Sequence, residues 1–279
     1  MNQFDWNNNK YQPNNIYNVD CYKAIKELPD KSIDLVYIDI PYDLEGNGGG
    51  GCFGSKKRDY HKEYEKVSQN TNVSGVQKRT TTTINNIKEI AFGIDYNILE
   101  ELCRIMKNIN IYIWCSKKQI PFLLNYFLDK GCFWELFVWH KTNPIPTCNN
   151  KYLSDTEYCL IFREQGTSVN NGNYHTKSKY YISELNKKDK DLYDHPTIKP
   201  LEVVKNHIIN STQQNDLILD CFLGSGTTAV ACKELGRRYI GFEIDENYFR
   251  IAKDRLNGIS QKDRKDKENG ITNIFDFID

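Results

Sequence analysis

The stretch Ile33-Asp34-Leu35-Val36-Tyr37-Ile38-Asp39-Ile40-Pro41-Tyr42 decides the fold. Seven of its ten residues are apolar or aromatic, which predicts a strand buried on both faces, as in a parallel sheet. Ligands of open α/β sheets bind outside the carboxyl ends of the strands, so we expect Asp39 and Tyr42 at the rim where chemistry takes place. Taken alone, the stretch is equally well interpreted as a buried strand followed by an ordinary proline turn.

A second run, Asp216 to Thr228, reads DLILDCFLGSGTT. It predicts a strand over 217–219, a Gly-Ser-Gly turn and a helix that begins near Thr227. Glycines let a backbone approach a ligand closely, and a helix start offers unpaired N–H groups. A further strand over 239–242 ends at Glu243, where an acid can accept hydrogen bonds from ribose hydroxyls. This order of elements within about thirty residues is a much stronger signal than a lone glycine turn.

Together these motifs resemble those of the amino-group (N6-adenine and N4-cytosine) DNA methyltransferases with the β arrangement, in which the catalytic tetrapeptide precedes the cofactor loop. The resemblance covers about residues 16–256. The matching pieces are Asn18-Val19-Asp20-Cys21, Asp39-Ile40-Pro41-Tyr42, His195-Pro196-Thr197-Ile198-Lys199-Pro200, Asp220 to Thr228, and Leu235 to Glu243.

The resemblance implies an α/β, Rossmann-like methyltransferase fold dependent on S-adenosylmethionine (SAM). Its sheet would be mostly parallel and seven-stranded, with one antiparallel strand and helices on both faces. The implied reaction moves a methyl group from SAM to the N6 amino group of adenine in double-stranded DNA, with base flipping and direct in-line transfer. No metal is implied. Asp as the first residue of the tetrapeptide favours adenine N6 over cytosine N4.

Site residues follow from the same resemblance. The catalytic residues would be Asp39, Ile40, Pro41 and Tyr42: Asp39 and the carbonyl of Ile40 accept the two amino hydrogens, and Tyr42 stacks on the base. The cofactor residues would be Asp20, Cys21, Asp39, Thr197, Lys199, Asp220, Phe222, Gly224, Ser225, Gly226, Thr227 and Glu243. In this scheme Lys199 pairs with the carboxylate of the donor.

DNA contacts are predicted from basic segments that lack apolar periodicity. We interpret residues 43–90 as a mobile insert over the site, with Lys56, Lys57 and Arg58 meeting phosphates. The motif order of the family that this chain resembles implies that residues 163–194, with Lys177 and Lys179, are the target-recognition segment, and it makes Lys141 and Asn143 candidate target-side residues. The alternatives are a disordered linker with incidental charges for 43–90 and a solvated polar insert for 163–194. The whole chain, 1–279, is expected to form one methyltransferase domain.

Composition sets the remaining bounds. The chain has 279 residues, 39% of them hydrophobic, enough for one sizeable core. Its 37 basic and 37 acidic residues cancel, so DNA affinity must come from local patches. We expect a soluble, cytoplasmic protein, since no long apolar run or signal peptide appears. Nine cysteines form no CxxC pair, which favours buried thiols over a zinc site.

Ile40 departs from the family, which usually carries proline at that position, and Cys221 replaces another common proline. Ile40 leaves a catalytically silent DNA-binding homologue as one alternative. A cytosine-N4 methyltransferase is the other, because the first residue of the tetrapeptide does not settle the target base. A nucleotide-dependent dehydrogenase is disfavoured, because its chemistry does not require the Asp39 to Tyr42 element. A cognate restriction endonuclease is a candidate partner, and the chain is expected to be a monomer or a homodimer.

Overall fold

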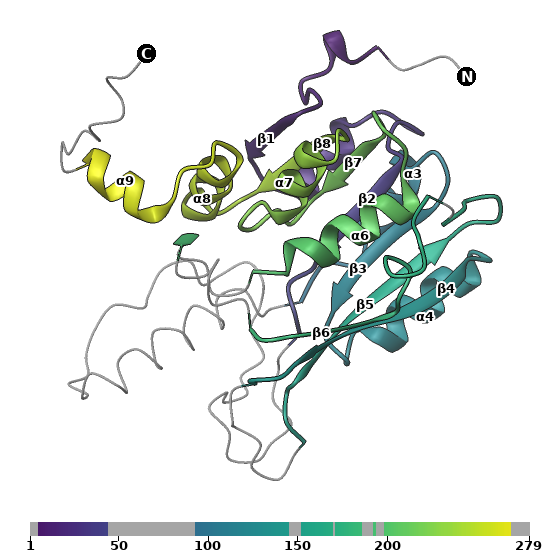
Figure 1. Ribbon diagram of the computed structural model, residues 1–279. Helices are drawn as coiled ribbons and strands as arrows, with labels where there is room; N and C mark the ends of the chain where they lie inside the picture. The colour runs from purple at the N-terminus through teal and green to yellow at the C-terminus, as the bar shows by residue number, and fades with distance from the viewer. Residues whose placement is uncertain are drawn as a thin grey trace, which may run out of the picture.

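The computed structural model describes residues 5–43, 93–144, 152–169, 171–185, 192–193 and 198–268. In this part of the chain eight strands form one sheet in the order β1-β8-β7-β2-β3-β5-β4-β6 (Figure 1). The strands are β1 (Asn15–Asn18), β2 (Leu35–Asp39), β3 (Asn110–Cys115), β4 (Phe133–Lys141), β5 (Thr156–Arg163), β6 (Tyr180–Ser183), β7 (Leu217–Asp220) and β8 (Arg238–Glu243).

The helices are α1 (Cys21–Ala24), α3 (Ile98–Ile105), α4 (Ile120–Asp129), α6 (Leu201–Ser211), α7 (Thr227–Glu234), α8 (Glu246–Leu256) and α9 (Gln261–Glu268), with short 3-10 turns η1 (Trp6–Asn8) and η2 (Ile25–Glu27). No helix of the described part is long and apolar enough to cross a membrane.

One strand, β5, runs antiparallel to both of its neighbours, β3 and β4, and all other described pairs are parallel. The predicted mostly parallel sheet with a single antiparallel strand is thus confirmed, but it has eight strands rather than seven. The additional strand is β6, which lies in the predicted target-recognition segment, 163–194. Its residues Tyr-Tyr-Ile-Ser suit a strand and pair with the edge of β4.

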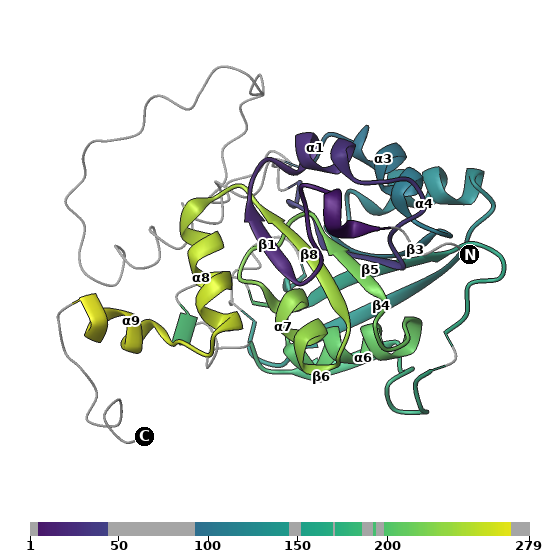
Figure 2. The same cartoon turned by 90° about the horizontal axis from the view of Figure 1, so that it is seen from above.

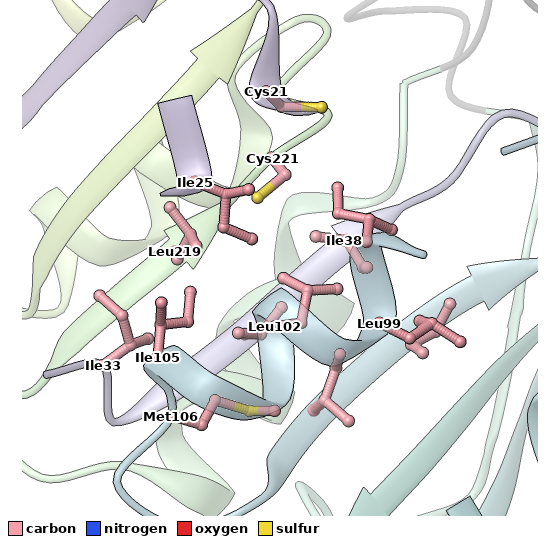
Figure 3. Packing of buried hydrophobic residues seen from close by; sticks show 14 of the residues in the cluster. Cys21, Ile25, Ile33, Ile38, Leu99, Leu102, Ile105, Met106, Leu219 and Cys221 are labelled. Atoms are coloured by element: carbon pink, nitrogen blue, oxygen red, sulfur yellow. The ribbon is translucent and has the colours of Figure 1, made fainter. Parts of the chain in front are cut away.

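Side chains of β2 alternate between two cores. Val36 and Ile38 pack in the cluster formed with α1, η2, α3 and α4, whereas Leu35 and Tyr37 pack in the cluster formed with α6 and α7. Figure 2 shows α1, α3 and α4 on one side of the sheet and α6 and α7 on the other. The close view in Figure 3 shows the first core, where Leu102 of α3 lies near Ile38. Burial on both faces explains why this strand reads as a nearly continuous apolar run.

The two runs that mark the sequence lie side by side. β2 and β7 are parallel neighbours, with Val36 opposite Leu219. β7 pairs with β8, and β8 pairs with β1, which places Asn18 opposite Glu243. The carboxyl ends of these four strands therefore share one edge of the sheet, called here the catalytic edge. This is the spatial relationship that the predicted site requires.

Candidate active site

Asp39 is the last residue of β2 and its two carboxylate oxygens have different surroundings. Oδ2 accepts a hydrogen bond from the Lys199 ammonium. Oδ1 is inaccessible and has no hydrogen-bond partner among the described residues, although the side chain as a whole is 31% exposed. A buried acceptor left without a partner costs about 1–3 kcal/mol, and such atoms call for a functional explanation. Oδ1 is therefore the candidate acceptor for a substrate hydrogen.

Two lysines and two carboxylates meet at this point. We call Asp39, Lys141, Glu157 and Lys199 the charged cluster. The Lys199 ammonium pairs with Asp39, lies 3.1 Å from Oε2 of Glu157 and donates to the Tyr42 hydroxyl at 3.3 Å. Lys141 occupies the other Glu157 oxygen, Oε1, at 2.5 Å. The cluster therefore balances two positive and two negative charges.

The two lysines and burial act in opposite directions on the carboxylates of this cluster. Burial by itself would raise the pKa of Glu157, but Lys199 and Lys141 outweigh burial and hold that pKa at about 2. Burial opposes the charge of Lys199 as well, yet Asp39 and Glu157 raise the Lys199 pKa above its ordinary value. For Asp39, burial raises the pKa, and Lys199 acts in the opposite direction. Lys199 is thus engaged by this cluster, and its pairing with a donor carboxylate stays a prediction.

The backbone after Asp39 is fixed at two points. The Ile40 N–H donates to the carbonyl of Trp114 at 3.2 Å, a bond that proline could not form. The Ile40 side chain is 1% exposed and belongs to the first core. The Pro41 carbonyl accepts from the buried Gln119 side chain at 3.0 Å. Isoleucine at position 40 therefore has its own hydrogen bond and its own packing.

The predicted cofactor loop follows β7 at the same edge. Gly224 and Gly226 have φ values of 51° and 80°, in the left-handed region that favours glycine. A Cβ at Gly226 would stand 2.9 Å from Cβ of Ala252 in α8. Glu243 accepts from the Gly224 N–H at 2.6 Å through Oε2 and from the Asp245 N–H at 2.9 Å through Oε1. Glu243, the last residue of β8, thus connects the glycine turn that follows β7 to the end of β8.

Arg255 of α8 donates hydrogen bonds to the same loop. Its guanidinium donates to the Ser225 carbonyl at 2.8 Å, and to the Ser225 and Thr227 hydroxyls at 2.9 Å each. Asp220 accepts from the Phe222 N–H at 3.0 Å, and burial raises the Asp220 pKa to about 7. The polar side chains of Asp220, Ser225 and Thr227 therefore have partners within or behind the loop, and their direct donor contacts stay predictions.

Asp20 and Cys21 lie beside this loop, after β1. Asp20 is the N-cap of α1 and accepts from the Tyr22 N–H at 2.9 Å. Cys21 is buried, and burial, with added contributions from the charges of Asp20 and Glu243, raises its pKa to about 12. Phe222 packs edge-on against Tyr22 at a ring separation of 6.4 Å. The structure therefore brings the Asp20 motif, the glycine turn and Glu243 together.

The predicted DNA contacts are more scattered. Lys141 belongs to the charged cluster, and Asn143 accepts from the Leu185 N–H at 2.7 Å. Lys179 precedes β6 and pairs with Glu135 of β4 at 2.8 Å. Thr197, Lys56, Lys57 and Arg58 lie outside the described residues, as does nearly all of the predicted insert.

Lys177 lies away from the catalytic edge, and its predicted contact with DNA stays a prediction. It belongs to residues 171–177, which bind Asn210 and Thr212 at the carboxyl end of α6. The neighbouring Ser211 carbonyl accepts from Asn110, the first residue of β3, so this segment lies at the amino ends of the parallel strands. In contrast, Glu184 and Leu185, later in the same predicted segment, contact Asn143 beyond β4.

Three residues of the site carried little sequence signal. Glu157 is a lone charge at the start of an apolar run, Gln119 begins no motif, and Arg255 occurs in an ordinary amphipathic helix. Because β5 is antiparallel, its first residues lie at the edge where parallel strands end, which brings Glu157 to Asp39. A charge at the start of a predicted strand was the only available hint.

A glycine turn after β7, an acid after the adjacent β8, and an Asp-Ile-Pro-Tyr tetrapeptide after β2 define the class: this is a SAM-dependent methyltransferase. The sequence profile of the DNA methylase family matches residues 33–254, and the chain belongs to that family of N6- and N4-amino methyltransferases. No group of three His, Cys, Asp or Glu side chains in the described ranges is placed to hold a metal ion.

Relatives and solved structures agree with this assignment. The chain is 27% identical over 258 residues to the Type II methyltransferase M2.LlaDCHI of Lactococcus lactis subsp. cremoris, with 87% of this chain and 88% of that protein covered. The M1.HpyAVI–SAM complex matches at 25% identity with a TM-score of 0.57, covering 86% of this chain and 98% of the other. The cytosine-N4-specific PvuII DNA methyltransferase shares the fold at 17% identity, with a TM-score of 0.64 and coverages of 95% and 96%.

Proposed function

We propose that this SAM-dependent DNA methyltransferase modifies the N6 amino group of adenine within a specific sequence of double-stranded DNA. The observation that carries the proposal is the buried Oδ1 of Asp39, an ionisable acceptor without a described partner at the carboxyl end of β2. An exocyclic amine needs such an acceptor, because its lone pair is delocalised into the ring. A hydrogen bond from the amine to Asp39 favours a pyramidal nitrogen.

The residues at the catalytic edge fit the methyl donor. SAM carries a sulfonium and an ammonium group, and Asp20, Asp39, Asp220 and Glu243 place carboxyl groups around the glycine turn. Bound SAM supplies a methyl group: the C–S bond breaks with its electrons going to sulfur, a C–N bond forms, and the amine releases a proton. Glu243 and the backbone of Gly224 to Gly226 would hold the nucleoside part.

On the target side, Asp39 Oδ1 would accept one amino hydrogen and the Ile40 carbonyl the other. Tyr42 would stack on the base, its hydroxyl held by Glu157 and Lys199. Burial raises the pKa of Tyr42 well above its ordinary value, so the ring stays neutral. Reaching a base in a duplex requires flipping it out of the stack, at a cost of a few kcal/mol. Correct alignment of nitrogen and methyl carbon is the main contribution of these residues.

Adenine is preferred over cytosine because the tetrapeptide begins with Asp. The test is expression in a host without DNA methylation, followed by digestion of its DNA to nucleosides. N6-methyladenine is expected, and its absence from the Asp39→Ala strain is the control. Accumulation of N4-methylcytosine would identify the runner-up activity. No modified base, with DNA binding retained, would identify a silent binding protein.

DNA would approach the catalytic edge, where Asn143, Glu184 and Leu185 lie beside the charged cluster. Type II relatives suggest a modification enzyme paired with a restriction endonuclease. Mapping the methylated bases by single-molecule sequencing gives the recognition sequence. Protection of that sequence against restriction enzymes that cut it would support the pairing.

A further inference from the structure

We propose that Glu157 is a positioning residue for methyl transfer: it holds the Lys199 ammonium on one oxygen of Asp39 and leaves the other oxygen for the target amine. The inference rests on the proposed function, because it takes Asp39 as the acceptor of that amine. Glu157 acts through Lys199 and Tyr42.

Glu157 forms ion pairs with two separate elements, β4 and the segment before α6. Its Oε1 pairs with Lys141 of β4, and its Oε2 pairs with Lys199, which precedes α6. The same Oε2 accepts from the Tyr42 hydroxyl at 3.3 Å. Both oxygens of Glu157 are thus occupied, and two of the described partners are Tyr42 of the tetrapeptide and Lys199, which pairs with Asp39. A carboxylate with only a packing role would not need to bind two separate parts of the site.

Burial strengthens the ion pairs that Glu157 forms with Lys141 and Lys199. The side chains of Glu157, Lys141 and Lys199 are 16%, 12% and 9% exposed, so their charges are poorly screened by water. Removing one partner from a buried set leaves an uncompensated charge, which is strongly unfavourable. The pair formed by Lys179 and Glu135 is the exposed counterpart, at 62% and 41%, and such pairs contribute little.

The position of Lys199 decides which Asp39 oxygen is free. Lysine carries a compact charge on a flexible four-carbon stem. With Glu157 in place, the ammonium is drawn away from Oδ1 and bonds to Oδ2. Without Glu157, the ammonium has one carboxylate left and can bridge both oxygens of Asp39. It would then compete with the target amine, and the Tyr42 hydroxyl would lose its carboxylate acceptor.

Asp39 is surrounded by titratable groups from every neighbouring element, and each enters the interpretation of its pH dependence. They are Lys199, Glu157, Tyr42, Lys141, Cys115 of β3, Cys159 of β5, Tyr37 of β2 and Asp220 of β7. Lys199 lowers the Asp39 pKa and Glu157 raises it. Replacing Lys199 and replacing Glu157 should therefore shift the pH dependence of methyl transfer in opposite directions.

The experiment measures single-turnover transfer of tritiated methyl from SAM to unmethylated genomic DNA over about pH 5 to 9. Glu157→Gln should lower the rate roughly 10–100-fold, the usual effect of a misplacement near 1 Å. It should also move the acid limb of the profile to lower pH, whereas Lys199→Met should move that limb to higher pH. In the Lys199→Met background no ammonium remains for Glu157 to hold, so adding Glu157→Gln should lower the rate much less than it does in the wild-type background. A residue with only a structural role would reduce the rate without moving the limb.

Glu135→Gln removes the exposed pair in the same sheet and is the matched control, with an unchanged rate and limb. SAM binding by calorimetry and a thermal melt accompany each variant, and the Glu157→Gln dissociation constant should stay within about twofold of wild type. If Glu157→Gln alone fails to fold, the charge-balanced double variant is compared with Lys199→Met, and a further loss of rate of about 10-fold or more overturns the inference. If Glu157→Gln folds, a wild-type rate or an unmoved acid limb overturns the inference. No label transfer by the wild-type protein overturns the proposed function instead.

Discussion

The Lys199 ammonium donates a hydrogen bond to Oδ2 of Asp39 across 160 residues of sequence. This contact joins the end of β2 to the start of α6. It leaves Oδ1 as the Asp39 oxygen without a partner in the described part of the chain. Lys199 therefore determines which Asp39 oxygen can accept a substrate hydrogen. Lys199 belongs to the motif that was predicted to bind the methyl donor.

Asp39→Ala should abolish methyl transfer, with a loss of at least about 100-fold, because the amine loses the acceptor that aligns it. SAM binding should remain, since the glycine turn and Glu243 are unchanged. Label transfer to DNA and calorimetry with SAM measure the two effects. Asp129→Ala, an exposed change at the end of α4, is the control. Turnover by Asp39→Ala near the wild-type rate would remove Asp39 from the mechanism.

Ile40→Pro should reduce stability more than catalysis. The substitution deletes the Ile40 N–H bond to Trp114 and a buried side chain, at a cost of about 2–4 kcal/mol in the free energy of unfolding. The carbonyl at position 40 is kept, so the single-turnover rate should stay within roughly tenfold of wild type. Urea unfolding and label transfer measure the two quantities. An unchanged midpoint would contradict the structural role of the N–H.

Arg255→Met should weaken SAM binding by about tenfold or more, because it removes three hydrogen bonds that hold the Ser225 to Thr227 backbone and hydroxyls. Arg250→Met, an exposed change in the same helix, is the control and should bind SAM normally. Arg255→Lys should recover part of the affinity. Calorimetry well below the melting temperature separates binding from stability. Equal affinities for the Arg255 and Arg250 variants would contradict the assignment.

Gly226→Ala should destabilise the protein through two effects, a positive φ and a steric clash with Ala252. Gly236 also has a positive φ, 67°, but nothing lies within 4 Å of its added Cβ, so Gly236→Ala reports backbone strain alone. Strain should cost about 1 kcal/mol, and the clash should add about 1–3 kcal/mol at position 226. Urea denaturation of both variants measures the difference. Equal losses would show that α8 yields to the new methyl group.

Asp220→Asn should change the pH dependence of stability in the absence of SAM. Burial raises the Asp220 pKa from 3.8 to about 7 in the folded state. Between these values the folded state keeps a proton that the unfolded state has lost, so this contribution is full below 3.8 and is lost as pH rises through 7. The variant lacks the titration, so its stability should fall less over this window. Asp129→Asn should keep the wild-type slope, and the same slope in Asp220→Asn would contradict the assigned shift.

Local sequence predicted most of the secondary structure. The apolar run over 33–42 predicted β2, and the run from Asp216 onward predicted β7, the start of α7 at Thr227 and β8, all close to their observed bounds. The edge strand β6 was missed, because four residues in a polar context give too short an alternation. Lys177 was assigned to the recognition segment from motif order and charge, and neither of these tells which end of α6 a segment contacts.

By itself the sequence determined that an acid ends a buried strand at position 39, that a glycine turn follows another strand, and that the motifs occur in the order of the β arrangement. The first two features depend on residues that are close together in the sequence, so periodicity and spacing report them. The order of the motifs can be read directly along the chain. Only the tertiary structure decided that Lys199 and Glu157 surround Asp39, and that Arg255 supports Ser225 and Thr227. The physical reason is that strand order and strand direction set these contacts, and charged side chains hundreds or tens of residues apart choose partners only after the sheet has formed.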